Sequence, residues 1–365
     1  FEVASEIGHP DAVLLRSYNM HDMDIPATVQ AIGRAGAGVN NIPIDAMTHR
    51  GVPVFNAPGA NANAVKELVI AGMLLAARNI CPAWRYVQEL EAEGAALNKL
   101  VEAGKKKFVG FELPARTLGV VGLGAIGGEV ANAAHSLGMR VIGFDPQLTV
   151  ERAWQLSSGI EQARSLDDLF SRADIVSFHV PLNDATRNLA NAERIALMPE
   201  GSVLLNFARG GIVDDEAVES ALAGNRLAAY VTDFPVAGLK DHPRVVALPH
   251  LGASTGEAEE NCAIMVANNV RDYLENGNIR HSVNFPEAQM PREGDNRLTI
   301  ANMNVPNMVG QISTCLADAG LNIHDMLNKS RGEIAYTLVD LDGSMSDETM
   351  QRIRGIDGVL SARLV

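Results

Sequence analysis

Short apolar runs alternate with amphipathic stretches along most of the chain. Residues 12–16 (AVLLR) and 52–55 (VPVF) have the length and composition of buried strands, and a strong helical pattern follows at 61–79. Further strand-like runs occur at 117–123, 140–145, 174–180, 202–207, 228–232 and 245–249, with helical segments between most of them. This alternation predicts parallel strands joined by crossover helices, and therefore a doubly wound α/β sheet.

The pattern changes after a long helix expected at 256–276. Residues 285–296 (FPEAQMPREGDN) combine two prolines with polar side chains, which is typical of a linker. Beyond it the pattern reads strand (297–303), helix (307–319), a pair of strands of which the second is 333–340, helix (346–354) and strand (358–365). The order βαββαβ predicts a small, separate domain of the ferredoxin-like type.

A chain of 365 residues is longer than one hydrophobic core usually supports. We predict one domain formed by residues 1–82 plus 266–290, a second formed by 83–265 and a third formed by 296–365. Because the chain begins with Phe1 rather than methionine, we also expect a first strand to precede it.

A glycine-rich loop lies between the strand at 117–123 and the helix that follows it. Gly122, Gly124 and Gly127 form a G-x-G-x-x-G, and Asp145 closes the next strand 18 residues after Gly127. Such glycines let a backbone approach a pyrophosphate at a helix N-terminus, and the carboxylate suits the ribose hydroxyls. A capping aspartate is the alternative. The combination predicts dinucleotide binding, and a carboxylate there favours NAD over NADP because it repels a 2′-phosphate.

His179, Val180 and Pro181 end a later strand at the same carboxyl edge of the sheet, where cofactors of doubly wound folds bind. We expect this triplet to lie near the cofactor, although core packing also explains it.

An arginine and a histidine follow two further strands. Arg209 is succeeded by Gly210 and Gly211, and its planar fork suits bidentate binding of a carboxylate. His250 leaves the strand at 245–249, and an imidazole, with an unperturbed pKa of about 6.5, can exchange a proton with a substrate hydroxyl. A surface arginine is the alternative for Arg209. No histidine pair has metal-ligand spacing, so no metal is expected.

Composition excludes several classes of partner. A net charge of −14 and a pI near 5.1 make nucleic acid or an anionic membrane an unfavourable partner. Cys81, Cys262 and Cys315 lack C-x-x-C spacing, which argues against zinc or disulfides and fits a reducing, cytoplasmic location. The longest apolar run, 68–77, is too short to cross a bilayer.

Several motifs occur in the order in which one enzyme family has them. H-V-P-L at 179–182, N-F-A-R-G-G-I-V-D at 206–214 and P-H-L-G-A-S-T at 249–255 follow the glycine loop and its acid. Together they resemble the D-isomer-specific 2-hydroxyacid dehydrogenases over essentially the whole chain. R-S at 16–17 and N-x-P-x-x-N at 56–61 resemble the branch that oxidises 3-phospho-D-glycerate.

The resemblance implies a Rossmann-type NAD domain, a flavodoxin-like substrate domain and a C-terminal ACT regulatory domain. It implies NAD-dependent oxidation of 3-phospho-D-glycerate to 3-phosphohydroxypyruvate, with Arg209 binding the carboxylate and His250 as the acid/base. Arg16 would reach the phosphate, although a structural ion pair also explains it. The backbone of Ala37, Gly38 and Val39 would bind the carboxylate. Further cofactor contacts implied by family position are Ala125, Ile126, Phe207, Ala208, Leu251, Gly252 and Ala253.

Three positions depart from the family pattern. The glutamate that usually pairs with the catalytic histidine is Ala237 here, so the imidazolium loses a stabilising charge unless Asp241 or Glu257 substitutes for it. Asp233 would stand in, one residue displaced, for the family's aspartate beside the nicotinamide. Lys66 replaces a small residue; we expect it either to contact the substrate or to be a solvated lysine.

The C-terminal domain resembles an effector-binding module. Asn304 and Asn322 match asparagines that bind L-serine across a domain dimer in the family, although turn formation also explains them. By analogy we expect a homodimer or homotetramer. Two other functions remain open at this stage: a hydroxypyruvate or glyoxylate reductase, and a non-catalytic NAD-sensing regulator.

Overall fold

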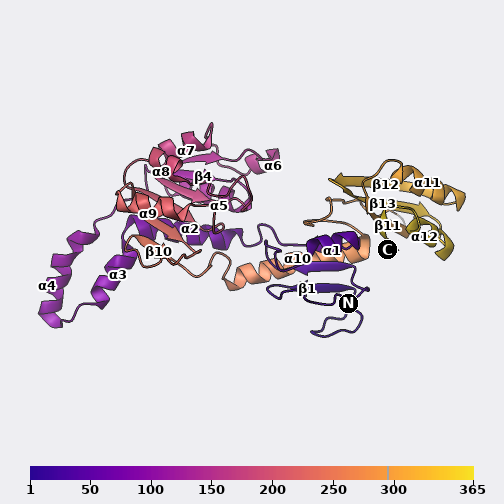
Figure 1. Cartoon of the computed structure of the whole chain (residues 1–365), viewed down its shortest axis with the longest axis horizontal. Helices are drawn as coiled ribbons and strands as arrows, with labels where there is room; N and C mark the ends of the chain where they lie inside the picture. The colour runs from indigo at the N-terminus through magenta and orange to yellow at the C-terminus, as the bar shows by residue number, and fades with distance from the viewer. Residues whose placement is uncertain (294–295) are drawn as a thin grey trace. The chain divides into compact units, whose positions relative to one another are not determined.

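The computed structural model describes residues 1–293 and 296–365, which form two compact units (Figure 1). The central unit is Asn61–Ala258, and the terminal unit combines Phe1–Ala60 with Glu259–Val365. Two residues of the expected linker, 294 and 295, lie outside the described residues. The three-domain boundaries stay a prediction.

The central unit is built on a seven-stranded sheet. Its strands are β4 (Thr117–Val121), β5 (Arg140–Phe144), β6 (Ile160–Gln162), β7 (Ile175–Phe178), β8 (Ser202–Asn206), β9 (Leu227–Thr232) and β10 (Val245–Ala247). They lie in the order β10-β9-β8-β7-β4-β5-β6, and every pairing is parallel. The strand order reverses between β4 and β7, which confirms the predicted Rossmann-type topology.

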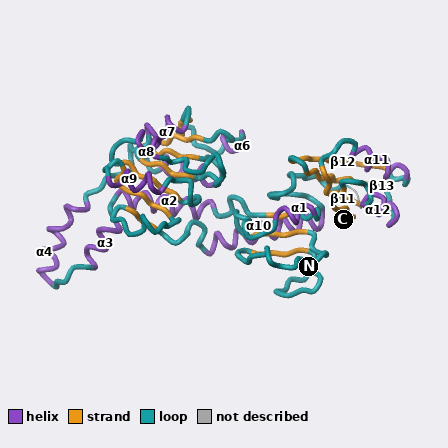
Figure 2. Tube along the Cα trace, in the orientation of Figure 1, coloured by secondary structure: helices purple, strands orange, loops and turns teal. Residues whose placement is uncertain are grey.

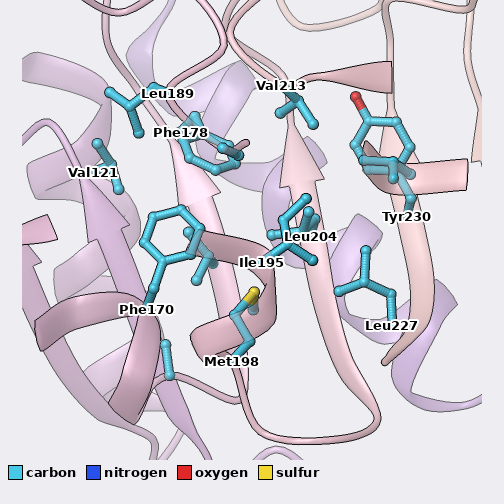
Figure 3. Close-up of a cluster of buried hydrophobic side chains, with 14 of the residues drawn as sticks. Val121, Phe170, Phe178, Leu189, Ile195, Met198, Leu204, Val213, Leu227 and Tyr230 are labelled. Atoms are coloured by element: carbon cyan, nitrogen blue, oxygen red, sulfur yellow. The ribbon is translucent and has the colours of Figure 1, made fainter. Parts of the chain in front are cut away.

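Helices cover both faces of this sheet. Successive side chains of a strand point to opposite faces, and here the apolar side chains on each face pack against helices. Leu204 of β8 packs in the cluster drawn in Figure 3, whereas its neighbours Val203 and Leu205 belong to a second cluster. The first cluster includes side chains of α7 (Leu166–Arg172), α8 (Ala192–Leu197) and α9 (Asp215–Ala223), and the second those of α2 (Ala62–Ala77) and α5 (Ala125–Ser136). A short helix, α6 (Val150–Ala153), follows β5.

A helical arm extends from the central unit (Figure 1). It consists of α3 (Ile80–Gln88), α4 (Gly94–Gly104) and the 3₁₀ turn Lys105–Phe108, and no residue of α3 is buried. The arm exposes large apolar side chains, namely Ile80, Trp84, Val87 and Leu100. Among the described residues, no helix has the length and apolar character needed to cross a membrane.

The terminal unit contains a three-stranded parallel sheet and a four-stranded antiparallel one (Figure 2). The first has the order β1 (Ala12–Leu15), β2 (Ala31–Arg34), β3 (Val54–Phe55), with α1 (Ile44–His49) between the last two. The sequence pattern did not predict strand β2. Its four residues, AIGR, include only two long aliphatic groups, the side chain of Ile32 and the stem of Arg34. Val266 of α10 (Gly256–Asn276) packs against β2, so closely that a Cβ on Gly33 would lie 2.4 Å from the valine Cγ1.

The four-stranded sheet confirms the predicted βαββαβ order. Its elements are β11 (Asn296–Met303), α11 (Met308–Asp318), β12 (Asn322–Arg331), β13 (Ile334–Asp342), α12 (Asp347–Arg354) and β14 (Val359–Leu364). The strand order is β12-β13-β11-β14, with antiparallel pairing throughout.

A buried ion pair ties this sheet to the segment that precedes it. Arg297 Nε donates to Asp340 Oδ1 at 2.6 Å, and both side chains are 0% exposed. The same guanidinium donates to the carbonyls of Asn276, Met290 and Pro291. The first part of the expected linker is therefore fixed, because its carbonyls satisfy a buried cation.

Candidate active site

Six of the predicted site segments lie at one edge of the seven-stranded sheet. Parallel strands bring their carboxyl ends together, and ligands of open α/β sheets bind beyond those ends. The segments begin at Gly122 after β4, Asp145 after β5, His179 after β7, Phe207 after β8, Asp233 after β9 and, three residues after β10, His250.

The glycine loop has no room for side chains at two of its positions. Gly122 has φ +88°, and a Cβ there would lie 2.6 Å from the carbonyl oxygen of His179. A Cβ on Gly127 would lie 1.8 Å from the carbonyl oxygen of Gly122. Gly124, the N-cap of α5, faces open space, since an added Cβ would meet nothing within 4 Å. The loop thus presents bare backbone and a helix N-terminus, which fits a pyrophosphate.

Asp145 joins the glycine loop to the exit of β5. Its Oδ2 accepts from the backbone N–H of Leu123, and its Oδ1 accepts from that of Gln147, both at 2.9 Å. Each carboxylate oxygen has a further lone pair, so these bonds leave acceptor capacity for ribose hydroxyls. Asp145 therefore caps its own turn and also fits the cofactor, and the two sequence interpretations are compatible.

His179 is held as a neutral ring. Its Nε2 lies 2.9 Å from the hydroxyl of Ser177, and burial lowers the pKa of the imidazole to about 3. The side chain of Val180 packs close to Gly122, and the carbonyl of Pro181 accepts from Thr186 Oγ1 at 2.6 Å. This triplet borders the glycine loop but carries no positive charge near neutral pH.

Arg209 is exposed, and its backbone is fixed by a residue whose role the sequence analysis missed. Asn206 ends β8; its Nδ2 donates to the carbonyl of Arg209 at 2.9 Å and its Oδ1 accepts from the N–H of Ala208. The guanidinium donates to the carbonyl of Ala208 at 2.6 Å. It forms no ion pair with a carboxylate in the described part of the chain. The sequence signal for this role was the asparagine that begins the N-F-A-R motif near the end of a predicted strand.

His250 is exposed in a left-handed backbone conformation, with φ +48°. Its N–H donates to the carbonyl of Asp233 at 2.9 Å. Its ring packs on that of Phe234, with centroids 4.7 Å apart and planes at 47°. The imidazole is thus supported on one side by an aromatic ring and open to solvent on the other.

Asp233 lies between the arginine and histidine segments. The residue is fully buried, Oδ2 accepts from the N–H of Gly252 at 3.0 Å, and Oδ1 has no hydrogen-bond partner in the described structure. Burial raises the pKa of this carboxyl group, while the Gly252 N–H and the charges of His250 and Arg209 lower it. Strands β8 and β10 both pair with β9, which Asp233 follows, so the Arg209 and His250 segments leave the sheet on either side of this residue.

The other predicted cofactor positions differ in what they expose. Ala125 and Ile126 begin α5, and Leu251 and Ala253 flank the buried Gly252. Ala208 is half-buried. Phe207 is 5% exposed, and its ring packs against Gly72 of α2, where an added Cβ would lie 2.9 Å from the ring. Only the backbone of Phe207 therefore faces the sheet edge.

The position of the missing glutamate and its two proposed substitutes, Asp241 and Glu257, are all exposed to solvent. Ala237 is exposed, and Asp241 pairs with Lys240 at 2.6 Å, with 83% of the aspartate side chain exposed. Glu257 is exposed near the start of α10. Lys66 of α2 hydrogen-bonds the side chain of Asn63 one turn away.

The predicted substrate residues of the terminal unit cluster where β1 and β2 end. Arg16 Nη1 pairs with Glu259 Oε1 at 2.6 Å, as the ion-pair alternative expects. The carbonyl of Ala37 accepts from Asn56 Nδ2 at 2.7 Å, and Gly38 and Val39 continue the same loop. Arg34, which the sequence analysis missed, donates from Nε to the carbonyl of Arg16 at 2.9 Å. Because the sequence pattern did not predict β2, no predicted strand end marked this arginine.

The predicted effector asparagines both make local hydrogen bonds. Asn304 Nδ2 donates to the carbonyl of Gly332 at 3.0 Å, and Asn322 Nδ2 donates to Asp342 Oδ2 at 2.7 Å. These bonds agree with a local stabilising role, and they use the amide nitrogens and not the amide oxygens.

The chain is similar to proteins of a known family. The family profile for "D-isomer specific 2-hydroxyacid dehydrogenase, NAD binding domain" matches residues 70–252. The D-3-phosphoglycerate dehydrogenase of Escherichia coli (strain K12) is 35% identical over 348 residues, which are 92% of this chain and 81% of that protein. The enzyme of the same name from Haemophilus influenzae is 34% identical over 347 residues, with the same two coverages.

Solved structures show the same relationship. NAD⁺-bound 3-phosphoglycerate dehydrogenase of Entamoeba histolytica matches with a TM-score of 0.58 and 28% identity, covering 75% of this chain and 82% of that one. A D-mandelate dehydrogenase of Rhodotorula graminis matches with a TM-score of 0.64 and 27% identity, covering 73% and 78%. The chain therefore belongs to the D-isomer-specific 2-hydroxyacid dehydrogenase family and carries that family's NAD-binding domain.

Proposed function

We propose that the protein oxidises 3-phospho-D-glycerate to 3-phosphohydroxypyruvate with NAD as the acceptor. One observation carries the chemistry: the Arg209 and His250 segments leave the strands on either side of β9, whose exit holds the buried Asp233, at the sheet edge that also holds the glycine loop. The substrate class is supported by relatives named D-3-phosphoglycerate dehydrogenase, whose similarity extends over 92% of the chain and so includes most of the C-terminal sheet.

The exposed guanidinium of Arg209 binds the substrate carboxylate in a bidentate manner, because no described carboxylate competes for it. The open side of His250 faces the substrate and takes the proton of the C2 hydroxyl during oxidation, or returns it during reduction. Bound NAD supplies the hydride acceptor. Asp233 would lie beside the nicotinamide, and Asp145 would hold the ribose hydroxyls.

In this proposal the other residues predicted to contact the substrate keep their expected roles. Arg16 would bind the phosphate after exchanging its partner Glu259, which is half-exposed and so gives up little on release. Arg34 lies beside it and adds a second guanidinium. Backbone N–H groups of residues 37–39 would bind the carboxylate, and Lys66 would contact the substrate.

We further propose a cytoplasmic homodimer or homotetramer that responds to L-serine at Asn304 and Asn322. The exposed apolar side chains of the α3–α4 arm support self-association, since a second copy would remove them from water. The chain divides functionally into a substrate domain at 1–82 plus 266–290, an NAD domain at 83–265 and an effector domain at 296–365.

A substrate panel tests the function. The purified protein should oxidise NADH with 3-phosphohydroxypyruvate and react far more slowly with hydroxypyruvate or glyoxylate, which lack the phosphate. A preference for glyoxylate would instead identify a glyoxylate reductase, the activity named for a similar structure from Paecilomyes thermophila with a TM-score of 0.61 and 29% identity. Tight NADH binding without turnover of any 2-keto acid would identify a non-catalytic regulator.

A further inference from the structure

Two guanidinium groups lie where strands β1 and β2 of the terminal unit end. Arg16 follows the last residue of β1, and Arg34 is the last residue of β2. The two strands pair in parallel, with Leu15 beside Arg34, so their carboxyl ends lie at one edge of the sheet. Arg34 Nε donates to the carbonyl of Arg16 at 2.9 Å, and Asn41 Nδ2 donates to the same oxygen at 3.3 Å. These bonds fix the backbone from which the Arg16 side chain extends.

The loop after β2 brings backbone instead of side chains to the same edge. Gly36 has φ +146°, and a Cβ at this position would overlap Nη1 of Arg34. The loop therefore lies directly against one guanidinium, and a hydrogen bond holds that arginine to the backbone of Arg16. Fixed positive charge beside open backbone is an arrangement that binds anions. This edge of the sheet consequently has the chemistry of an anion site.

Glu259 of α10 already supplies an anion to this edge. Its Oε1 lies 2.6 Å from Nη1 of Arg16. Positions i+3, i+7 and i+11 of a helix lie on the same face as position i. Here those three positions are buried in the core that α10 shares with the three-stranded sheet, namely Cys262, Val266 and Val270. The register of the helix therefore directs Glu259 toward the sheet.

The ion pair is weak enough to be exchanged. The Arg16 side chain is 45% exposed and that of Glu259 is 50% exposed, so water screens their attraction. A phosphate group carries more than one negative charge near neutral pH and accepts several hydrogen bonds, so it is the stronger partner for a guanidinium. A phosphate at Arg16 would also face the carboxylate of Glu259, and the two like charges repel. Entry of a phosphate must therefore displace this carboxylate.

We propose that Glu259 is a specificity-determining residue, which competes with the phosphate group of the substrate for Arg16. The inference rests on the proposed function for the identity of that substrate. Before substrate binds, the carboxylate neutralises the guanidinium, and a phosphorylated acid binds only by breaking this pair. An unphosphorylated acid leaves the pair intact. Glu259 therefore lowers the affinity for phosphorylated substrate selectively, and it assists release of phosphorylated product by pairing with Arg16 again.

Steady-state kinetics with two substrates test the proposal. Glu259→Gln keeps the length of the side chain and an acceptor for Arg16 but removes the charge. We expect KM for 3-phosphohydroxypyruvate to fall by about twofold to fivefold, the range that a half-exposed ion pair supports, and KM for hydroxypyruvate to stay unchanged. Glu260→Gln is the matched control, because Glu260 is exposed, forms no ion pair in the part of the chain that the structure describes and changes the net charge equally. It should leave both KM values unchanged.

A double-mutant cycle identifies the partner through which the charge acts. In an Arg16→Ala background, Glu259→Gln should no longer lower KM for 3-phosphohydroxypyruvate, because the cation for which the two anions compete is gone. A higher or unchanged KM in Glu259→Gln, an equal fall in Glu260→Gln, or a fall that persists without Arg16 would overturn the inference.

Binding of inorganic phosphate separates this inference from the proposed function, because it needs no turnover. With NADH at saturation, calorimetric titration should show phosphate binding about twofold to fivefold tighter in Glu259→Gln than in the wild type, with no such gain when Arg16→Ala is also present. If this gain is observed while the wild type fails to reduce 3-phosphohydroxypyruvate, the proposed function is wrong and the inference stands. Equal phosphate affinity in the two proteins contradicts the inference, even if the wild type reduces 3-phosphohydroxypyruvate.

Discussion

Gly127 offers the sharpest test of the cofactor site, because replacing it with alanine puts a methyl group against the backbone. The new Cβ would lie 1.8 Å from the carbonyl oxygen of Gly122 and 2.9 Å from its carbonyl carbon. An ordinary van der Waals contact needs 3.4 Å, so helix and loop must separate by about 1.6 Å (3.4 minus 1.8). The atoms that must move are backbone atoms of the phosphate-binding loop.

The energetic cost follows from two opposing terms. Overpacking of a well-packed site costs about 1–3 kcal/mol or more, and alanine recovers about 1 kcal/mol of helix propensity relative to glycine. The loop is also tied to Asp145 through the N–H of Leu123, so its displacement carries the ribose-binding carboxylate with it. We therefore expect Gly127→Ala to weaken NADH binding by about tenfold to a hundredfold and to lower the melting temperature.

Gly128→Ala is the matched control on the same helix. Its Cβ would meet Leu156 Cδ2 at 3.5 Å and the carbonyl oxygen of Leu123 at 3.7 Å, which are ordinary contacts. NADH fluorescence titration and thermal unfolding of both variants check the prediction. If Gly127→Ala binds NADH as tightly as Gly128→Ala and melts no lower, the close approach of helix and loop has been misjudged.

Two further predictions concern Asp340 and Asp145. Asp340→Asn breaks the buried pair with Arg297 and should reduce the free energy of unfolding by about 3–5 kcal/mol in urea titration, because it leaves the guanidinium without its counter-charge. Burial raises the pKa of Asp340, but the hydrogen bonds from Arg297 and the Glu293 N–H, together with the charge of Arg297, lower it overall. The stabilisation is therefore present above about pH 4 and disappears as the pH falls through the pKa of the folded state. A difference in stability between the wild type and Asp340→Asn that persists at still lower pH would contradict this. Asp145→Ala should weaken NADH binding by about tenfold and reduce the preference for NADH over NADPH, and an unchanged preference would argue that the carboxylate serves only to cap its turn.

Sequence patterns predicted the parts of the fold that local chemistry determines. Strands β4, β7 and β8 are mostly apolar and buried at every position, and the glycine loop has a motif that fits a strand–turn–helix. The long helix at 256–276 was predicted with the bounds it has, because its amphipathic pattern is uninterrupted between Gly256 and Asn276.

Other features depend on contacts between residues far apart in the chain, which a local pattern does not contain. β2 is recognisable only beside α10, and the linker expected at 285–296 is partly fixed because Met290 and Pro291 supply carbonyls to Arg297. In the described structure Asp233 Oδ1 is buried without a hydrogen-bond partner, and only tertiary structure reveals such an absence.

One measurement tests the proposed substrate site most directly: kcat/KM for 3-phosphohydroxypyruvate in Arg209→Ala compared with the wild type. Arg140→Ala, at the start of β5 and thus at the opposite edge of the sheet, controls for loss of a surface charge. We predict that Arg209→Ala lowers kcat/KM by about 30- to 5000-fold, the equivalent of about 2–5 kcal/mol for a substrate carboxylate left unpaired, while Arg140→Ala changes it little. A value for Arg209→Ala within about threefold of that of Arg140→Ala, at equal NADH affinity, would contradict the assignment of this sheet edge as the site where the substrate is bound and oxidised.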